Sequence, residues 1–190
     1  MSLFLRFRSS RGPVELAVDM AGVRMGERVL YVGVGDPRVF GRVSSKVGLT
    51  GRACAVVDSA AAQATLERAA ARQGVLVEVA LDPGGCWPYD FSSFDVALVD
   101  ANALPGAPTT DRQNRLANIV RVVRPGGRVL AIRRRPRGIA ARLGFESTPG
   151  APGSHAQELV RALEQAGCRS VRVLAQREGL LFVEGFRPNA

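Results

Sequence analysis

"VLYVGVGDP", Val29 to Pro37, is an apolar strand that runs into two glycines spaced one residue apart. In α/β proteins, a strand that ends in a glycine turn and leads into a helix commonly receives a nucleotide-like ligand. Such a loop usually carries a third glycine, and this chain has Pro37 near that position. The stretch is therefore consistent with a working cofactor loop, a degenerate cofactor loop or a simple tight turn.

Predicted strands and helices alternate around this stretch. Strands are predicted over 28–32, 53–57, 75–81, 95–99 and 128–132, and helices over 13–21, 39–47, 60–73 and 110–124, with a later helix that begins at Ser154 and stops at Gly167. Two further strands, "RSVRVLAQ" and "GLLFVEGF", are separated only by Arg177-Glu178. So short a link requires an antiparallel hairpin. The pattern predicts an α/β fold, a Rossmann-like doubly wound seven-stranded sheet with a C-terminal antiparallel hairpin.

Length and hydropathy favour a single globular domain. The chain has 190 residues, 46% of them hydrophobic, which suits one domain over 1–190. No apolar run approaches the ~20 residues that a membrane helix needs. The opening "MSLFLRFRSSRG" holds too short an apolar patch for a signal peptide. We therefore expect a cytoplasmic protein with no membrane span.

The charge balance is strongly basic. The net charge is +9, and it comes almost entirely from arginine, because Lys46 is the only lysine. Such a balance can indicate a nucleic-acid partner or an acidic substrate. No aromatic residues interleave with the arginines as a base-stacking surface would require. We therefore do not expect nucleic acid as a partner.

Cysteine and histidine are too sparse for a structural metal site. Cys54, Cys86 and Cys168 lie far apart, no C-x-x-C pair occurs, and His155 is the only histidine. A zinc site or a disulfide framework is not expected from this spacing. The cysteines are expected to act as small buried apolar residues.

Carboxylates follow three successive predicted strands. Asp58 ends the second strand, Asp82 follows the third, and Asp100 follows the fourth. In a doubly wound sheet these positions share one rim with the glycine stretch, where ligands bind. Asp58 could instead cap the next helix, and Asp82 could serve only its turn. Their joint occurrence favours a ligand site, in which Asp58 would bind ribose hydroxyls at roughly 1.5–3 kcal/mol per hydrogen bond.

The glycine spacing distinguishes between cofactor classes. The dinucleotide fingerprint G-x-G-x-x-G would place its third glycine at Arg38, so that fingerprint fails. The segments "RVLYVGVGDP", "VGLTGRACAVVDS", "VEVALDPGG", "FSSFDVALVDANAL" and "VRPGGRVLAI" precede the closing hairpin in that order. In order and spacing, over nearly the whole chain, the sequence resembles class I S-adenosylmethionine-dependent methyltransferases. The resemblance is nearest to the ubiquinone/menaquinone-biosynthesis type, with a degenerate glycine motif.

This resemblance implies roles for particular residues. Gly33 and Gly35 would bracket the methionine part of S-adenosylmethionine, and Asp58 would hold its ribose. Asp82 would lie near the adenine amino group. The stretch from Asp100 to Asn102 would line the space beside the transferable methyl group.

The sequence also departs from the family pattern. Tyr31 stands where the family usually has an acidic residue, and Pro37 stands where it has a glycine. Asp36 would then supply the carboxylate for the cofactor's ammonium group. Ser59 stands where a larger apolar residue often covers the adenine. The magnesium-dependent O-methyltransferases have an Asp-Asn pair where this chain has Arg133-Arg134, so no metal is expected.

The leading hypothesis is an S-adenosylmethionine-dependent methyltransferase for a small-molecule acceptor. No catalytic residue is identified from the sequence. The alternative is a non-catalytic subunit of the same fold that binds a protein partner, and Tyr31 and Pro37 favour it. The stretch 133–153 is the candidate for a lid. The oligomeric state stays open, with a homodimer among the alternatives.

Overall fold

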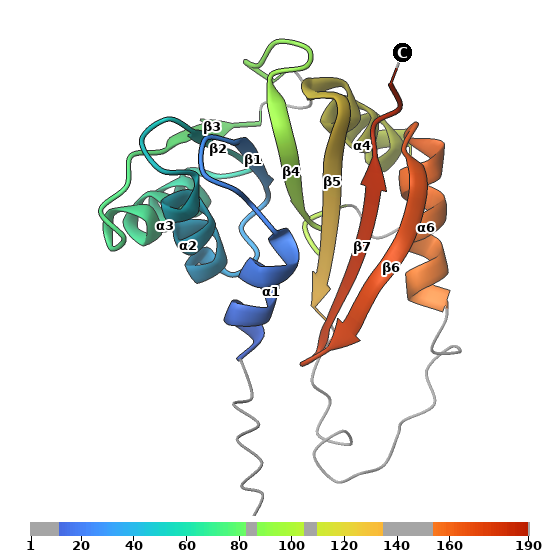
Figure 1. Cartoon of the computed structure of the whole chain (residues 1–190), viewed down its shortest axis with the longest axis horizontal. Helices are drawn as coiled ribbons and strands as arrows, with labels where there is room; N and C mark the ends of the chain where they lie inside the picture. The colour runs from blue at the N-terminus through green and yellow to red at the C-terminus, as the bar shows by residue number, and fades with distance from the viewer. Residues whose placement is uncertain (1–11, 83–86, 105–109, 135–153, 190) are drawn as a thin grey trace, which may run out of the picture.

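The computed structural model describes residues 12–82, 87–104, 110–134 and 154–189, and it contains a seven-stranded sheet in the order β3-β2-β1-β4-β5-β7-β6 (Figure 1). The strands are β1 (Arg28–Val32), β2 (Arg52–Val57), β3 (Glu78–Leu81), β4 (Phe94–Asp100), β5 (Val123–Arg134), β6 (Arg169–Arg177) and β7 (Leu180–Phe186). The helices are α1 (Pro13–Ala21), α2 (Pro37–Val47), α3 (Ala60–Ala71), α4 (Thr110–Val122) and α6 (Ser154–Gln165). The predicted α/β fold is confirmed.

The C-terminal hairpin is antiparallel, as predicted. β7 pairs antiparallel with both β5 and β6, and the other pairings in the sheet are parallel. The predicted link, Arg177-Glu178, is one residue too early, because Arg177 still pairs with Leu180. Glu178 and Gly179 form the turn, with φ angles of 54° and 73°. Two successive positive φ angles match the right-handed twist of the strands that the turn joins.

Two apolar layers cover the two faces of the sheet. The helices α1, α2 and α3 lie on one face, and α4 and α6 lie on the other (Figure 1). Alternate residues of β1 divide between them: Val29 and Tyr31 join the first layer, and Leu30 and Val32 join the second. This alternation explains the continuous apolar run of β1, because a parallel strand covered on both faces buries every side chain. Among the described residues, no helix combines the length and the apolarity that crossing a bilayer requires.

Several predicted boundaries are wrong, and the largest errors are at the starts of the third and fifth strands. The third strand was expected from Val75, and it begins at Glu78. The helix expected to reach Arg124 ends at Val122, and "RPGG" lies inside β5 as a bulge. Val123 is buried and pairs with Phe94 on β4. The chain therefore joins the sheet before it reaches Gly126 and Gly127.

The strand order reverses between β1 and β4. β1 lies beside both β2 and β4, and the chain passes to the other half of the sheet at this point. Val32 of β1 pairs with Val99 of β4, so the next residues, Gly33 and Asp100, emerge side by side at the carboxyl ends. In doubly wound sheets this reversal opens a crevice where ligands bind.

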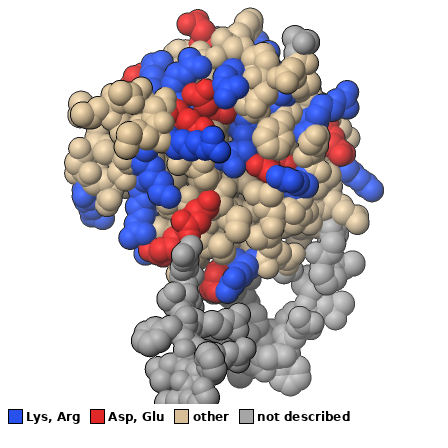
Figure 2. Space-filling model, viewed as in Figure 1, with Lys and Arg blue, Asp and Glu red and all other residues tan. Residues whose placement is uncertain are grey.

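A buried carboxylate ties the last three strands together. Glu184 on β7 is only 3% exposed. Its Oε1 lies 3.3 Å from Nη1 of Arg128 on β5, and its Oε2 lies 3.0 Å from Nη2 of Arg172 on β6. Arg128 also donates to the carbonyl of Ala21 at the end of α1. On the face shown in Figure 2, basic and acidic side chains lie interspersed over the surface.

We expect Glu184→Gln to lower the free energy of unfolding by roughly 1.5–3 kcal/mol, because it leaves the partly buried Arg128 without its charged partner. Urea unfolding followed by circular dichroism measures the change. The control is Glu78→Gln, since the Arg52–Glu78 pair is about half exposed on both sides. An exposed pair contributes about 0–1 kcal/mol. Equal losses in the two variants would contradict the role assigned to Glu184.

Candidate functional site

The loop after β1 takes the backbone shape that its glycines allow. Gly33 has a φ angle of 90° and Gly35 one of 51°, both in the region that side chains disfavour. Pro37 is the first residue of α2, where its missing N–H costs no hydrogen bond. The helix predicted over 39–47 therefore begins two residues earlier than expected, at Pro37.

The space beside each glycine is occupied by the protein itself. A Cβ atom on Gly33 would lie 2.8 Å from Cβ of Ala103 and 3.0 Å from Cβ of Asp100. A Cβ atom on Gly35 would overlap the hydroxyl oxygen of Tyr31. Both glycines are therefore required by internal packing. A larger residue at Gly33 would perturb the fold as well as any ligand.

Tyr31 fills the core beneath the loop. It is 3% exposed, and its ring centroid lies 5.3 Å from that of Phe40. Burial, followed by the charges of Asp100 and Asp36, raises the pKa of Tyr31 well above its usual value. The hydroxyl therefore stays protonated at neutral pH, and Tyr31 does not replace the acidic residue of the family pattern as an anion.

Asp100 links the two strands at the reversal point. Its Oδ2 accepts a hydrogen bond from the backbone N–H of Gly35 at 2.9 Å. Its Oδ1 accepts one from the backbone N–H of Asn102 at 3.0 Å. The carboxylate thus fixes the glycine loop of β1 to the loop that follows β4.

Asp36 is already engaged by two arginines. It caps α2, accepting from the Arg38 backbone N–H at 3.1 Å, and it forms a two-point pair with the Arg38 side chain at 3.0 and 2.8 Å. Arg134 reaches the same carboxylate at 3.2 Å. The hydrogen bond from the Arg38 side chain holds the pKa of Asp36 below its usual value. Asp36 is therefore ionised, but in the structure its partners are guanidinium groups.

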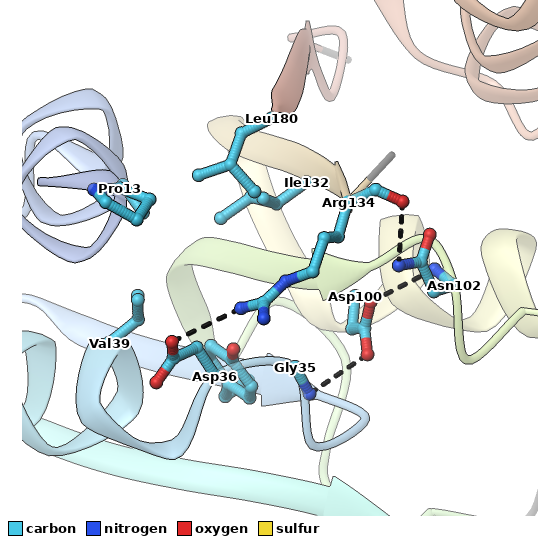
Figure 3. Close-up of a pocket in the computed structure, with 11 residues that line it drawn as sticks. Pro13, Gly35, Asp36, Val39, Asp100, Asn102, Ile132, Arg134 and Leu180 are labelled. Carbon is cyan, nitrogen blue, oxygen red and sulfur yellow. Dashed lines mark hydrogen bonds and ion pairs between the residues drawn. The ribbon is translucent and has the colours of Figure 1, made fainter. Parts of the chain in front are cut away.

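The first cavity at this rim is the Arg134 pocket, with a volume of about 190 Å³ (Figure 3). Its lining residues are Pro13, Ala17, Tyr31, Gly35, Asp36, Val39, Asp100, Asn102, Ile132, Arg134 and Leu180. Figure 3 shows the Arg134 guanidinium lying between the loop carboxylates and the side chains of Ile132 and Leu180. The pocket thus combines an apolar wall with a charged floor.

The second cavity is the Asp58 hollow, on the other side of the glycine loop. Its lining residues are Val32, Gly33, Val56, Val57, Asp58, Asp82, Asp100, Ala103, Leu104 and Arg115, and its volume is about 20 Å³. Asp100 lines both cavities. The structure therefore brings Asp58, Asp82 and Asp100 together at one rim.

Asp58 is exposed and available to a ligand. The cap of α3 is Ser59, whose Oγ accepts from the Ala62 N–H at 3.3 Å. Asp58 makes no hydrogen bond or ion pair with any residue that the structure describes. The helix-cap alternative for Asp58 is therefore not supported.

Asp82 is paired inside the protein. Its side chain is 2% exposed, and its Oδ2 lies 3.2 Å from Nη2 of Arg115 on α4. The turn that Asp82 was alternatively expected to serve continues into residues 83–86, which lie outside the described residues. Sequence reasoning missed Arg115, because no local pattern connects a loop after β3 to a residue on α4.

The basic pair at the end of β5 divides between the two faces of the sheet. Arg133 pairs with Glu158 of α6 at 3.2 Å, whereas Arg134 enters the pocket. Strand alternation predicts that neighbours point to opposite faces, but not which one meets a cavity. Apart from these two arginines, the predicted lid over 133–153 lies outside the described residues.

We expect Gly35→Ala to destabilise the protein strongly, because it combines a left-handed backbone, costing roughly 1–2 kcal/mol, with the overlap on the Tyr31 hydroxyl. In a Tyr31→Phe background the nearest remaining ring atom lies 3.5 Å away, an ordinary contact distance. The same substitution should then cost at least about 1 kcal/mol less. A double-mutant cycle by denaturant unfolding measures this coupling.

The control for this cycle is Gly74→Ala. Gly74 has a φ angle of 67° and no atom within 4 Å of an added Cβ, so it reports the backbone cost alone. A Gly35→Ala loss no larger than the Gly74→Ala loss would show that the Tyr31 hydroxyl does not restrict the loop.

Comparison with solved structures identifies the fold. A SAM-dependent methyltransferase from Aquifex aeolicus has a TM-score of 0.71 at 20% identity, with 92% of this chain and 89% of that chain covered. A SAM-dependent methyltransferase from Methanosarcina mazei has a TM-score of 0.63 at 18% identity, with 88% and 95% covered. The [4+2]-cyclase SpnF has a TM-score of 0.66 at 16% identity, with 93% and 80% covered. No protein-family model and no curated protein matches the sequence.

These similarities show that the chain has the Rossmann-like α/β fold of class I SAM-dependent methyltransferases. Identities of 20% and below support the fold, and function must be argued from the site. The nearer resemblance to the ubiquinone/menaquinone-biosynthesis type stays a prediction.

Proposed function

We propose that the chain is an S-adenosylmethionine-dependent methyltransferase for a small-molecule acceptor. The observation that carries this proposal is the convergence of Gly33, Asp58, Asp82 and Asp100 on one hollow at the strand reversal. Turn chemistry alone does not require three carboxylates at successive strand ends. A ligand with hydroxyl and amino donors would account for Asp58 and Asp82, while Asp100 fixes the two loops at the same rim.

Each carboxylate has a role in this proposal, and Asp100 would border the space beside the transferable methyl group. Asp58, which is free on the rim, accepts hydrogen bonds from the ribose hydroxyls. Asp82 gives up its ion pair with Arg115 and accepts a hydrogen bond from the adenine amino group. Gly33 and Gly35 bracket the methionine part, and Asp36 faces its ammonium group.

The polar groups fit the cofactor, but the Asp58 hollow must widen. A volume of about 20 Å³ holds little more than one water molecule. A nucleoside therefore requires displacement of residues that line the hollow, such as Ala103, Leu104 and Arg115. We infer that binding and this displacement occur together.

When bound, the cofactor supplies a methyl group already activated by its sulfonium. The chain's own residues would hold and orient the two reactants, and orientation can supply ~7–11 kcal/mol of the barrier. Asp100 and the Asn102 backbone keep the loop after β4 in place beside the Arg134 pocket. Tyr31 is buried and protonated, so it does not serve as a general base.

A non-catalytic role is the second candidate, and a specific contact favours it. The packing of Ala103 on Gly33 and the Asp82–Arg115 pair close the nucleoside side of the site. A protein that had lost cofactor binding would retain such contacts as permanent structure. It would then use the sheet to bind a protein partner.

Calorimetry with S-adenosylmethionine and S-adenosylhomocysteine on the purified protein distinguishes the two candidates. Micromolar binding of either ligand supports the methyltransferase. Absence of binding at millimolar ligand supports the non-catalytic subunit.

We expect Asp58→Ala to weaken binding of both ligands by about ten- to a hundredfold, since it removes ~1.5–3 kcal/mol of hydrogen bonding to ribose. The thermal midpoint should change little, because Ser59 supplies the helix cap. Asp90→Ala is the control, an exposed aspartate outside both cavities. Normal binding together with a lowered midpoint would instead assign Asp58 a structural role.

A further inference from the structure

Arg134 is the most loosely held charged group in its pocket. Its side chain is 57% exposed, and its pairing with Asp36 is a single contact, from Nη2 to Oδ2 at 3.2 Å. The Asp36 side chain is only 11% exposed, but solvent reaches the guanidinium and screens this single contact, so the pair is weak. The guanidinium has five N–H donors, so most of them stay free for another partner.

The loop carboxylates do not depend on Arg134. Asp36 keeps the two-point pair with Arg38 and the backbone hydrogen bond that caps α2. Asp100 keeps the N–H groups of Gly35 and Asn102. Arg134 can therefore turn to a ligand and leave no carboxylate without a hydrogen-bond partner.

The main chain of Arg134 is fixed while its side chain is free. Nδ2 of Asn102 donates to the Arg134 carbonyl at 3.2 Å, and β5 pairs with β7 at this position through Leu180. Figure 3 shows the side chain extending from this anchor across the pocket, below Ile132 and Leu180. The guanidinium thus lies beside an apolar wall.

We propose that the Arg134 pocket binds a small carboxylate-bearing molecule whose apolar body packs on Ile132, Leu180 and Val39. A carboxylate can accept two parallel hydrogen bonds from a guanidinium, which is stronger and more selective than the single contact to Asp36. Binding therefore exchanges a weak ion pair for a stronger one. The inference rests on the proposed function, because the carboxylate would belong either to the methyl acceptor or to the cofactor.

The size of the pocket limits the ligand. Its volume is about 190 Å³, below the roughly 300–1,000 Å³ of sites for drug-sized ligands. A single-ring acid is the appropriate scale. The carboxylate could belong to a separate acceptor or to the methionine end of the cofactor, and both present the same chemistry to Arg134.

Two ligand pairs separate these sources in calorimetry. Benzoate and benzamide share a shape but differ in charge, so they probe a separate acceptor. S-adenosylhomocysteine and 5′-methylthioadenosine share the nucleoside, but only the first has the carboxylate. The variants are Arg134→Gln and, as the matched control, Arg133→Gln, whose parent side chain pairs with Glu158 on the opposite face.

In the parent protein we expect the carboxylate member of at least one pair to bind at least tenfold more tightly than its partner. Arg134→Gln should remove that preference, and Arg133→Gln should keep it. A preference confined to benzoate assigns the pocket to the acceptor, and one confined to S-adenosylhomocysteine assigns it to the methionine end. No preference in the parent, or a preference that survives Arg134→Gln, overturns the proposal.

The outcomes also separate this proposal from the proposed function. If neither nucleoside binds but benzoate shows the Arg134-dependent preference, the methyltransferase fails and the pocket proposal stands. If both nucleosides bind with no dependence on Arg134, and benzoate binds no more tightly than benzamide, the pocket proposal fails and the methyltransferase stands.

Discussion

The hydrogen bond from the Gly35 N–H to the Asp100 carboxylate is the contact on which the site depends. It joins the loops after β1 and β4 at the point where the strand order reverses between these two strands. Because the other oxygen of the same carboxylate holds Asn102, the positions of both cavities follow from this side chain. The Arg134 pocket and the Asp58 hollow lie on either side of the bridge, and Asp100 lines both of them.

The sequence predicted the architecture well because the architecture is encoded locally. Val29 to Val32 is apolar at every position, as a strand buried on both faces requires. The short link before Leu180 permitted only a hairpin. The boundaries were predicted less accurately. Val123 was predicted to be helical, but it lies in β5 and pairs with Phe94, which is distant in sequence. Pairing of this kind cannot be inferred from local propensity.

The site was predictable in position but not in its contacts. Asp58, Asp82 and Asp100 were placed at one rim from strand order alone, and the structure places them there. The partner of Asp82 could not be predicted, because Arg115 reaches it from a helix elsewhere in the chain. Nor could the sequence show that Gly35 is constrained by Tyr31 beneath it. Both facts arise from packing in three dimensions, which spacing does not encode.

The antiparallel placement of β7 leaves β6 as an outer strand of the sheet, with Arg169, Arg172 and Arg177 exposed along it. An outer strand carries unpaired backbone groups that a second molecule could extend, which is a route to aggregation. Arginines along that strand would place like charges face to face in such a contact, and the register shifts between β6 and β7 interrupt the regular pairing surface. The exposed arginines of β6 therefore oppose edge-to-edge association between two copies of the chain.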